Sequence, residues 1–286
     1  MLPLLPLLTS GLTFEVTPVV RSDAPTLRRA ATFFASAFWA ESTTVADMRS
    51  RGDASLDARA LRSLTTHTLT DMASRYGSGA GERLRSLLVL ASDPSRGKIV
   101  GCVGVEEALF EPLTGRVLSR AESDALFASE FAAMDEQEES LYVGLASAAA
   151  LTDALFPEYS VVAVLSNLAV ESSERRGGLA QELCAWCATA GEEWGLPALV
   201  LQVDRTNRPA RSLYERLGFR ELCRDEGATA LRLRPQEATA ASTLLLVESD
   251  RLLQEAPATL ITMAKDLTIA PQHPGAGPRS ADAPSR

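Results

Sequence analysis

Histidine and lysine are scarce in this chain of 286 residues. The only histidines, His67 and His273, lie outside every motif described below, so a Ser-His-Asp or Cys-His mechanism has little support. The only lysines are Lys98 and Lys265, and the net charge is −9. A nonspecific nucleic-acid-binding protein needs a basic surface for phosphate contacts, so this composition excludes that class.

Cysteine is also rare, and the four residues do not form the pattern of a zinc site. Cys184 and Cys187 form a C-x-x-C pair, which raises a redox or metal interpretation. No second cysteine pair or nearby histidine completes a site, and both residues fall in the middle of an amphipathic helical pattern. We therefore predict reduced, buried cysteines and no bound metal.

Long apolar runs are missing as well. The opening segment MLPLLPLL is too short to span a bilayer, contains two prolines and lacks the basic leader of a signal peptide. With 46% hydrophobic and 23% charged residues, the composition is that of a globular protein. The sequence thus predicts a soluble intracellular protein without membrane or nucleic-acid partners, and it leaves cytoplasm and plastid equally open.

Alternation and helical spacing predict a strand, two helices and a hairpin in the first 110 residues. The strands are expected over residues 12–17, 86–92 and 98–110. One helix should begin after Ser22 or Asp23, with Pro25 in its first turn, and another should cover about 56–76. This order alone is compatible with many folds.

The remaining boundaries follow from composition. The segment 111–160 is too long for a hairpin connection. It contains an expected helix near 121–134, followed by an acidic run. We therefore interpret it as a solvated insertion rather than a substrate lid. The expected division is an N-terminal extension at 1–10, one domain over 11–234, a C-terminal helical extension over 235–269 and a disordered tail over 270–286. Strands near 219–224 and 229–233 should close the sheet of the domain.

A strand, a glycine turn and a helix follow one another at the centre of the chain. The strand VVAVLSNLAV covers residues 161–170, and a helix is expected over about 176–194. Glycines at a helix start expose backbone N–H groups at the positive end of the helix dipole, where a diphosphate can bind. A Rossmann site is the nearest alternative, but its G-x-G-x-x-G fingerprint is absent. The turn comprises Arg175, Arg176, Gly177, Gly178, Leu179 and Ala180.

A second motif lies downstream, in a predicted strand over 198–204 and a short helix over 208–217. Arg-x-x-Gly-x-Ala after an apolar strand, followed by Asn-x-x-Ala-x-x-x-Tyr-x-x-x-Gly-Phe, closely resembles the GNAT superfamily of acyl-CoA N-acyltransferases. The SNLAV segment is most similar to protein acetyltransferases related to RimI and to the plastid GNATs. The resemblance implies an α/β (α+β) GNAT fold, with a mixed central β-sheet flanked by helices and splayed fourth and fifth strands.

The resemblance also implies a cofactor site for acetyl-CoA. The strand before the turn should carry a bulge and leave backbone groups unpaired for the pantetheine arm and the acyl carbonyl. The diphosphate should bind backbone N–H groups from Arg176 to Gln181, where Gly177 and Gly178 allow close approach. The implied cofactor-binding residues are Leu168, Ala169, Val170, Arg175, Arg176, Gly177, Gly178, Leu179, Ala180, Gln181 and Asn207.

Tyr214 is implied as the general acid that protonates the departing CoA thiolate. A tyrosine with an ordinary pKa near 10 is protonated at neutral pH, as this role requires. The alternative is that Tyr214 packs in the core with Leu217 and Phe219, with its hydroxyl satisfied nearby. The match around Tyr214 favours the catalytic role.

The general base stays open, because Gln202 occupies the position where RimI-like sequences have a glutamate. Glutamine does not accept a proton from an ammonium group. Water, or a carboxylate such as Glu106, Glu107 or Asp204, could serve instead. We expect Glu106 and Glu107 to be solvated strand residues rather than bases.

The sequence therefore predicts an N-acetyltransferase that transfers acetyl from acetyl-CoA to an amine. A protein or peptide amine, either an N-terminal α-amine or a lysine, is the expected acceptor. A small-molecule amine acetyltransferase and a catalytically weak acyl-CoA-binding regulatory module are the two alternatives.

Overall fold

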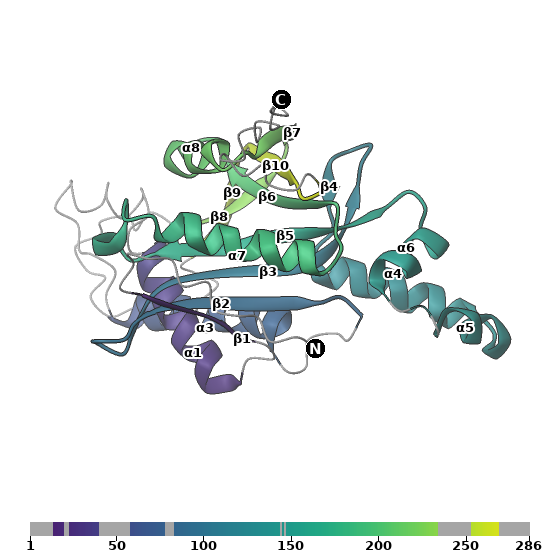
Figure 1. The fold of residues 1–286 in the computed structure, drawn as a ribbon, viewed down its shortest axis with the longest axis horizontal. Helices are drawn as coiled ribbons and strands as arrows, with labels where there is room; N and C mark the ends of the chain where they lie inside the picture. Colours follow the sequence, from purple (N-terminus) through teal and green to yellow (C-terminus); the bar gives the residue numbers. More distant parts are fainter. Residues whose placement is uncertain are drawn as a thin grey trace, which may run out of the picture.

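The computed structural model describes residues 14–19, 23–39, 58–77, 83–143, 145, 147–233 and 253–268. Its main sheet has eight strands in the order β1-β2-β3-β5-β6-β10-β7, with the short strand β4 paired to β3 (Figure 1). The pair β5–β6 is parallel, and the other neighbouring strands are antiparallel. The strands are β1 (Glu15–Val19), β2 (Ser86–Asp93), β3 (Lys98–Glu111), β4 (Arg116–Val117), β5 (Ser160–Val170), β6 (Ala198–Asp204), β7 (Arg220–Asp225) and β10 (Leu260–Asp266).

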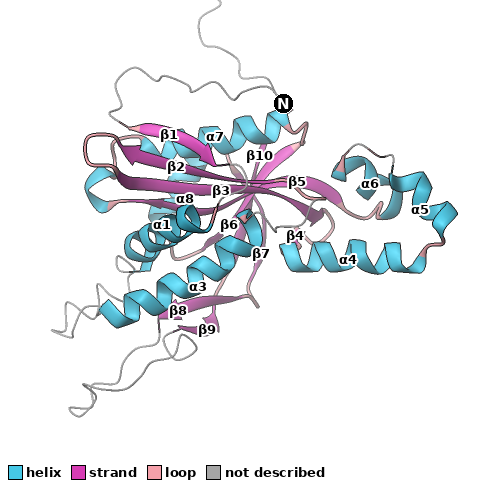
Figure 2. Ribbon diagram, turned by 90° about the horizontal axis from the view of Figure 1, so that it is seen from below, coloured by secondary structure: helices cyan, strands magenta, loops and turns pink. Residues whose placement is uncertain are grey.

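Helices cover both faces of this sheet, which makes a mixed α/β fold (Figure 2). On one face α7 (Leu179–Glu193) packs against β3 and β5, as the crossover of the parallel pair requires. On the other face α1 (Ala24–Phe34), the π-helical turn η1 (Ala35–Trp39) and α3 (Ala58–Tyr76) pack together. Two buried apolar clusters fill the spaces between sheet and helices.

The N-terminal elements agree with the sequence prediction, apart from the first strand. Asp23 caps α1 by accepting a hydrogen bond from the Thr26 N–H at 2.8 Å, and Pro25 lies in the first turn. Strands β2 and β3 and helix α3 lie where the periodicity placed them. Strand β1 begins at Glu15, three residues later than expected, and part of the segment expected as strand lies outside the described residues.

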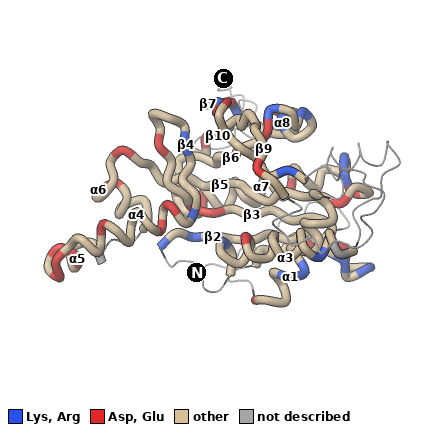
Figure 3. Tube along the Cα trace, turned by 180° about the vertical axis from the view of Figure 1, so that it is seen from behind, with Lys and Arg blue, Asp and Glu red and all other residues tan. Residues whose placement is uncertain are grey.

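The insertion between β3 and β5 is more structured than the sequence indicated. The expected helix is present as α4 (Arg120–Ala133), with a capping box between Ser119 and Glu122. Two further helices, α5 (Glu136–Val143) and α6 (Ala148–Leu155), follow it. Together these helices project from the end of the sheet, and the acidic residues of α5 lie at the far tip (Figure 3).

The predicted C-terminal helix over 235–269 is wrong in its described part. Residues 253–257 form β9 and residues 260–266 form β10, which lies inside the main sheet between β6 and β7. The expected domain end at residue 234 is therefore also wrong, since the sheet needs β10. Strand β8 (Thr229–Leu233) does not close the main sheet as expected, but pairs with β9 in a separate two-stranded sheet. The predicted extension at 1–10 and tail at 270–286 lie outside the described residues.

Strand β5 has the two irregularities that the resemblance implied. Its pairing with β3 shifts register between Cys102 and Gly104, where β5 contains one extra residue, and Asn167 has a φ of 53°. Its pairing with β6 is limited to Ala163 and Val164, so the two strands separate along the rest of β5. This separation leaves a gap in the ladder beside the end of β5.

Candidate active site

The turn before α7 is held in a conformation that depends on its glycines. After β5 the chain makes one 3₁₀ turn (Ser172–Glu174) and enters α7 through Gly178, whose φ is 92°. Arg176 also has a positive φ, 67°. Both values lie in the left-handed region, so the helix cannot begin at residue 176 as expected and begins at Leu179. A Cβ placed on Gly178 would meet no atom within 4 Å, so the space above this turn is open.

Several backbone N–H groups of the turn have no partner. In the part of the chain that the structure describes, the N–H groups of residues 176 and 178–180 donate to no acceptor, whereas the Gly177 N–H closes the turn over residues 175–176. The Gln181 N–H differs, because it donates to the Gly178 carbonyl at 2.9 Å. A row of free donors at a helix N-terminus is suited to a diphosphate or another anion. Of the six N–H groups expected to bind the diphosphate, from Arg176 to Gln181, four are free, and those of Gly177 and Gln181 are not.

Arg175 has a structural contact that the sequence did not indicate. Its Nε donates to the Val170 carbonyl at 3.1 Å, and its Nη2 donates to the Ala37 carbonyl at 3.1 Å. The guanidinium therefore ties the end of β5 to η1. This contact holds the start of the turn in place and occupies a carbonyl of Val170 that the resemblance assigned to the cofactor.

The gap between β5 and β6 lies next to this turn. Leu168, Ala169 and Val170 form the last part of β5, beyond the two residues that pair with β6. Ala169 and Val170 still pair with β3, so only their β6 side is open. Ala169 and Val170 are buried and Leu168 is half-buried, and their side chains pack into the two apolar clusters on either face of the sheet.

Helix α8 (Arg208–Arg216) carries Asn207 and Tyr214. The Asn207 Oδ1 accepts a hydrogen bond from the Ala210 N–H at 3.3 Å, so this side chain caps the helix. Tyr214 is 7% exposed and packs edge-on against Phe219, with ring centroids 5.7 Å apart. Burial, with smaller contributions from Cys184 and Cys187, raises the pKa of Tyr214 well above its ordinary value. The hydroxyl therefore remains protonated at neutral pH.

Of the carboxylates considered as bases, Asp204 and Glu107 are fully engaged. Asp204 forms an ion pair with Arg232 and accepts hydrogen bonds from the Thr206 N–H and hydroxyl at 2.7 and 2.5 Å. Glu107 accepts from the Arg85 side chain at 2.6 and 2.9 Å and from the Arg85 N–H at 2.7 Å. Gln202 is exposed on β6, opposite Thr262 of β10.

The prediction that Glu106 and Glu107 are solvated is wrong. Glu106 is 4% exposed and Glu107 is 1% exposed, because helices cover both faces of β3. Glu106 accepts a hydrogen bond from Arg75 Nη1 at 2.5 Å. The partners Arg75 and Arg85 lie more than twenty residues earlier, so no local pattern could reveal the two ion pairs.

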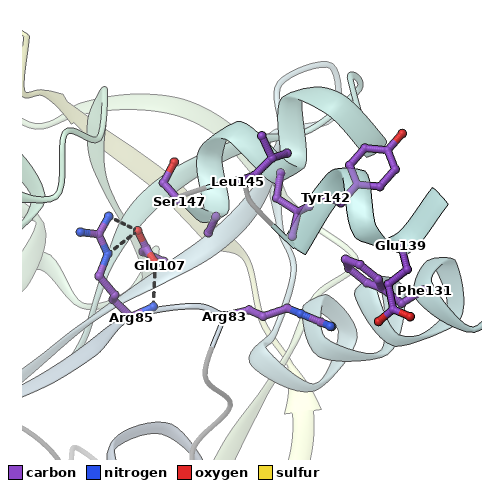
Figure 4. Close-up of a pocket in the computed structure, with 10 residues that line it drawn as sticks. Arg83, Arg85, Glu107, Phe131, Glu139, Tyr142, Leu145 and Ser147 are labelled. Atoms are coloured by element: carbon purple, nitrogen blue, oxygen red, sulfur yellow. Dashed lines mark hydrogen bonds and ion pairs between the residues drawn. The ribbon is translucent and has the colours of Figure 1, made fainter. Parts of the chain in front are cut away.

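A separate cavity of about 470 Å³ lies between the insertion and the start of β2 (Figure 4). The Arg83 guanidinium lies over the Phe131 ring, 4.1 Å from its centroid. The Arg85 side chain points away from Phe131 and toward Glu107. Glu107 pairs with Ala163, seven residues before Val170 along β5. The cavity therefore lies far from the glycine turn and does not belong to the same site.

The cysteine pair shows no sign of reactivity. Cys184 and Cys187 are buried on α7, and burial raises the pKa of Cys184 to about 12. A thiol with such a pKa is protonated and unreactive at neutral pH. Within the described ranges, no group of three or more metal-ligating side chains occurs, and no helix is long and apolar enough to cross a membrane.

A sequence profile of known proteins matches this arrangement. The profile of the "Acetyltransferase (GNAT) family" matches residues 66–219, which is more than half of the chain and includes the strand, the turn and the helix of Tyr214. The chain belongs to the GNAT acetyltransferase family.

Individual relatives are more distant. "GCN5-related N-acetyltransferase 4, chloroplastic" from Arabidopsis thaliana is 37% identical over 82 residues, which is 29% of this chain and 27% of that relative. The ribosomal-protein-S18-alanine N-acetyltransferase from Escherichia coli is 16% identical, with a TM-score of 0.40 over 91% of this chain and 97% of that one. Naa20 from Chaetomium thermophilum, solved with a bisubstrate analogue, is 14% identical, with a TM-score of 0.36 over 63% of this chain and 66% of that one. Both TM-scores are low, so the family assignment rests on the sequence profile.

The residues of this GNAT chain fit acetyl-CoA, which the family uses. The free N–H groups of residues 176 and 178–180 form an anion site, and the left-handed Gly178 leaves open space above it. The gap between β5 and β6 adjoins the turn and offers unpaired backbone toward β6. A diphosphate with an attached amide-containing arm matches both features.

Proposed function

We propose that this protein transfers an acetyl group from acetyl-CoA to an amine of a protein or peptide, either an N-terminal α-amine or a lysine. The observation that carries the proposal is the row of free N–H groups at the left-handed turn, beside the gap where β5 leaves β6. The SNLAV strand supports a protein or peptide acceptor through its resemblance to protein acetyltransferases.

Each residue set has a distinct task in this proposal. The N–H groups of residues 176 and 178–180 bind the diphosphate, and the backbone of Leu168 and Ala169 that is open on its β6 side orients the arm in the gap. When bound, acetyl-CoA supplies the acetyl group as an activated thioester. The Tyr214 hydroxyl, protonated because it is buried, donates its proton to the leaving sulfur.

The acceptor nitrogen must be neutral when it attacks the thioester. An α-amine has a pKa near 8, whereas a lysine with a pKa near 10.4 favours its protonated form at pH 7 by about 4.6 kcal/mol, which deprotonation must overcome. The net charge of −9 favours approach of a cationic acceptor. We therefore expect α-amines to be acetylated faster than lysines near neutral pH.

The test is CoA thiol release from acetyl-CoA with three sets of acceptors. The first set is peptides whose single amine is the N-terminus, the second is N-blocked peptides with one lysine, and the third is small-molecule amines. Turnover with either peptide set supports the proposal. Turnover with small amines alone indicates a small-molecule acetyltransferase. Tight acetyl-CoA binding with no turnover indicates a regulatory module.

A further inference from the structure

Glu106 is a buried carboxylate with only one of its two oxygens engaged. Its Oε1 accepts from Arg75 Nη1 at 2.5 Å. Its Oε2 is buried and has no hydrogen-bond partner in the described part of the chain. A buried polar atom without a partner is destabilising by roughly 1–3 kcal/mol, so its presence requires an explanation.

Two hydroxyl groups, one on α3 and one on β5, lie on the same side of the sheet as this carboxylate. The Tyr76 hydroxyl on α3 forms a hydrogen bond of 2.6 Å with the Ser166 hydroxyl on β5, and either group can be the donor. The Tyr76 hydroxyl lies over Gly104, where a Cβ would come within 1.9 Å of it. Gly104 is therefore the residue that makes room for this pair of hydroxyls, two positions before Glu106 on β3.

These groups share one face of the sheet with the gap. Glu106 pairs with Val164, and Val164 pairs with Val200, so all three side chains lie on the face opposite α7. Ser166 and Gln202 each follow two residues later on their strands and lie on the same face. The strands β5 and β6 separate beyond Val164, so the Ser166 hydroxyl lies at the point where the gap opens.

The charged and titratable groups around Glu106 come from two helices. Arg75, Asp71 and Tyr76 face it from α3, and Arg120 faces it from α4. Burial raises the pKa of Glu106, and Arg75 only partly opposes this effect. Tyr76 and Glu106 interact electrostatically, and the Tyr76 hydroxyl is itself held protonated by burial.

We propose that Glu106 accepts the proton of the acceptor ammonium through the hydroxyls of Ser166 and Tyr76. The inference deepens the proposed function, on which it rests. Ser166 takes a proton from the ammonium nitrogen and passes its own to Tyr76. No hydrogen bond joins the Tyr76 hydroxyl to Glu106 Oε2 in the described residues, so the Tyr76 proton crosses to Oε2 through one bridging water, which accepts one proton and gives another. One N–H bond breaks, one carboxyl O–H bond forms, both hydroxyls and the water are restored, and the electron pair stays on the nitrogen. Glu106 thus supplies the base that Gln202 cannot be.

The neighbouring Glu107 provides a matched control. It is the same residue type, one position later on β3, equally buried and also paired with an arginine, but it lies on the other face and both its oxygens are engaged. A change that acts only through loss of a buried charge affects both positions. A change that acts on proton transfer affects Glu106 alone.

The first experiment is the pH profile of kcat/KM with acetyl-CoA and two acceptors, an α-amine peptide and an N-blocked lysine peptide. The wild type should show a break at the same pH with both acceptors, because it belongs to the enzyme. Glu106→Gln should lower kcat/KM by about 10²- to 10⁴-fold and make the break follow the pKa of the acceptor. Glu107→Gln should keep the fixed break. A wild-type break that moves with the acceptor, or a Glu106→Gln profile equal to the wild type, overturns the proposal.

The second experiment does not depend on turnover. Infrared difference spectra across pH, without acceptor, should show one buried carboxyl band that titrates above the ordinary glutamate pKa, is lost in Glu106→Gln and shifts in Tyr76→Phe. The absence of such a band overturns the inference, even if acetylation is established.

If Glu106→Gln fails to fold, Ser166→Ala takes its place in the kinetic test and should reduce kcat with little change in KM for acetyl-CoA. If no acceptor set is turned over, the proposed function fails, while the infrared result still decides whether Glu106 titrates.

Discussion

The two faces of β3 carry adjacent carboxylates, Glu106 and Glu107, that are equally buried and differently satisfied. On the α7 face, Arg85 engages both oxygens of Glu107, and the same guanidinium also donates to the Trp194 carbonyl at the end of α7 at 3.0 Å. On the α3 face, Arg75 engages one oxygen of Glu106 and leaves the other without a partner. Both carboxylates are therefore buried, but they differ in the number of their partners. Glu107 is fully engaged in an ion pair that joins structural elements, whereas Glu106 has one oxygen available for a proton.

The same contrast extends across the sheet. The α7 face holds Tyr214 and the thiols of Cys184 and Cys187, whose protons are retained because burial raises their pKa values. The α3 face holds the linked hydroxyls of Tyr76 and Ser166 beside Glu106. We infer that one face gives a proton and the other takes one. The predictions below test this division, from the largest expected effect to the smallest.

Removing the Tyr214 hydroxyl should have the largest effect. Tyr214→Phe should reduce turnover about 10²- to 10⁴-fold, because no other group on the α7 face is proposed to protonate the leaving sulfur. Acetyl-CoA binding, measured by calorimetry, should change less than twofold, since the ring and its contact with Phe219 remain. An unchanged rate, with chemistry shown to be limiting, would make Tyr214 a packing residue.

Glu107→Gln should act on stability rather than on chemistry. Hydrogen bonds to charged groups contribute roughly 1.5–3 kcal/mol, and Arg85 is partly exposed, so we expect a loss of about 1–2 kcal/mol in the free energy of unfolding. Urea denaturation measures this loss. The exposed Glu158 serves as control, since Glu158→Gln should have no measurable effect. Equal stability of the Glu107→Gln variant and the wild type would contradict the structural role.

Gly178→Val should weaken acetyl-CoA binding. A branched side chain at a φ of 92° is strained by about 1–2 kcal/mol and fills the open space above the free N–H groups. At an acetyl-CoA concentration of a hundred times Kd, the free energy of unfolding of the wild type should increase by about 2.7 kcal/mol, which is measured as a rise in Tm. The same concentration should raise the stability of the variant by less.

Gly195, at the other end of α7, is the matched control for Gly178. It also has a positive φ, 73°, and open space around it. Gly195→Val should lose similar stability but keep the full rise in Tm with acetyl-CoA. Equal loss of the ligand effect in both variants would show that strain in α7, rather than the turn, governs binding.

The smallest effect concerns pH and stability. A glutamate whose pKa is raised on folding contributes stability that is present below its unfolded pKa and is lost as pH rises through its folded pKa. The stability of the wild type relative to Glu106→Gln should therefore fall as pH rises above about 4.5, by at most about 1.4 kcal/mol per pH unit. Urea midpoints at several pH values measure it. A difference that grows with pH would mean that the pKa of Glu106 is lowered.

Local patterns predicted the elements whose signals are local. The cap at Asp23, the strand pair β2–β3 and the glycine turn depend on residues within a few positions of each other, and the structure contains all three. The family motif predicted the bulge and the separation of β5 from β6. The roles of the predicted cofactor residues remain predictions, apart from the structural contacts of Arg175 and Asn207.

Distant contacts could not be predicted in this way. The sequence of β10, LITMAKD, reads equally as a helix or a strand, and only its place between β6 and β7 decides the matter. Glu106 and Glu107 look like the polar residues of a half-exposed strand, because α3 and α7 that cover them come from other parts of the chain. Burial of a charged residue is a property of tertiary packing rather than of its own segment.

The position of β10 also has a consequence for how the chain is made. During synthesis, β6 and β7 leave the ribosome well before residues 260–266, and β7 joins the main sheet only through β10. Until β10 emerges, β6 presents an open edge and β7 has no strand to pair with in that sheet. The last step of folding therefore inserts a late strand between two earlier ones, and nascent chains stopped before residue 260 should be the forms most dependent on chaperones.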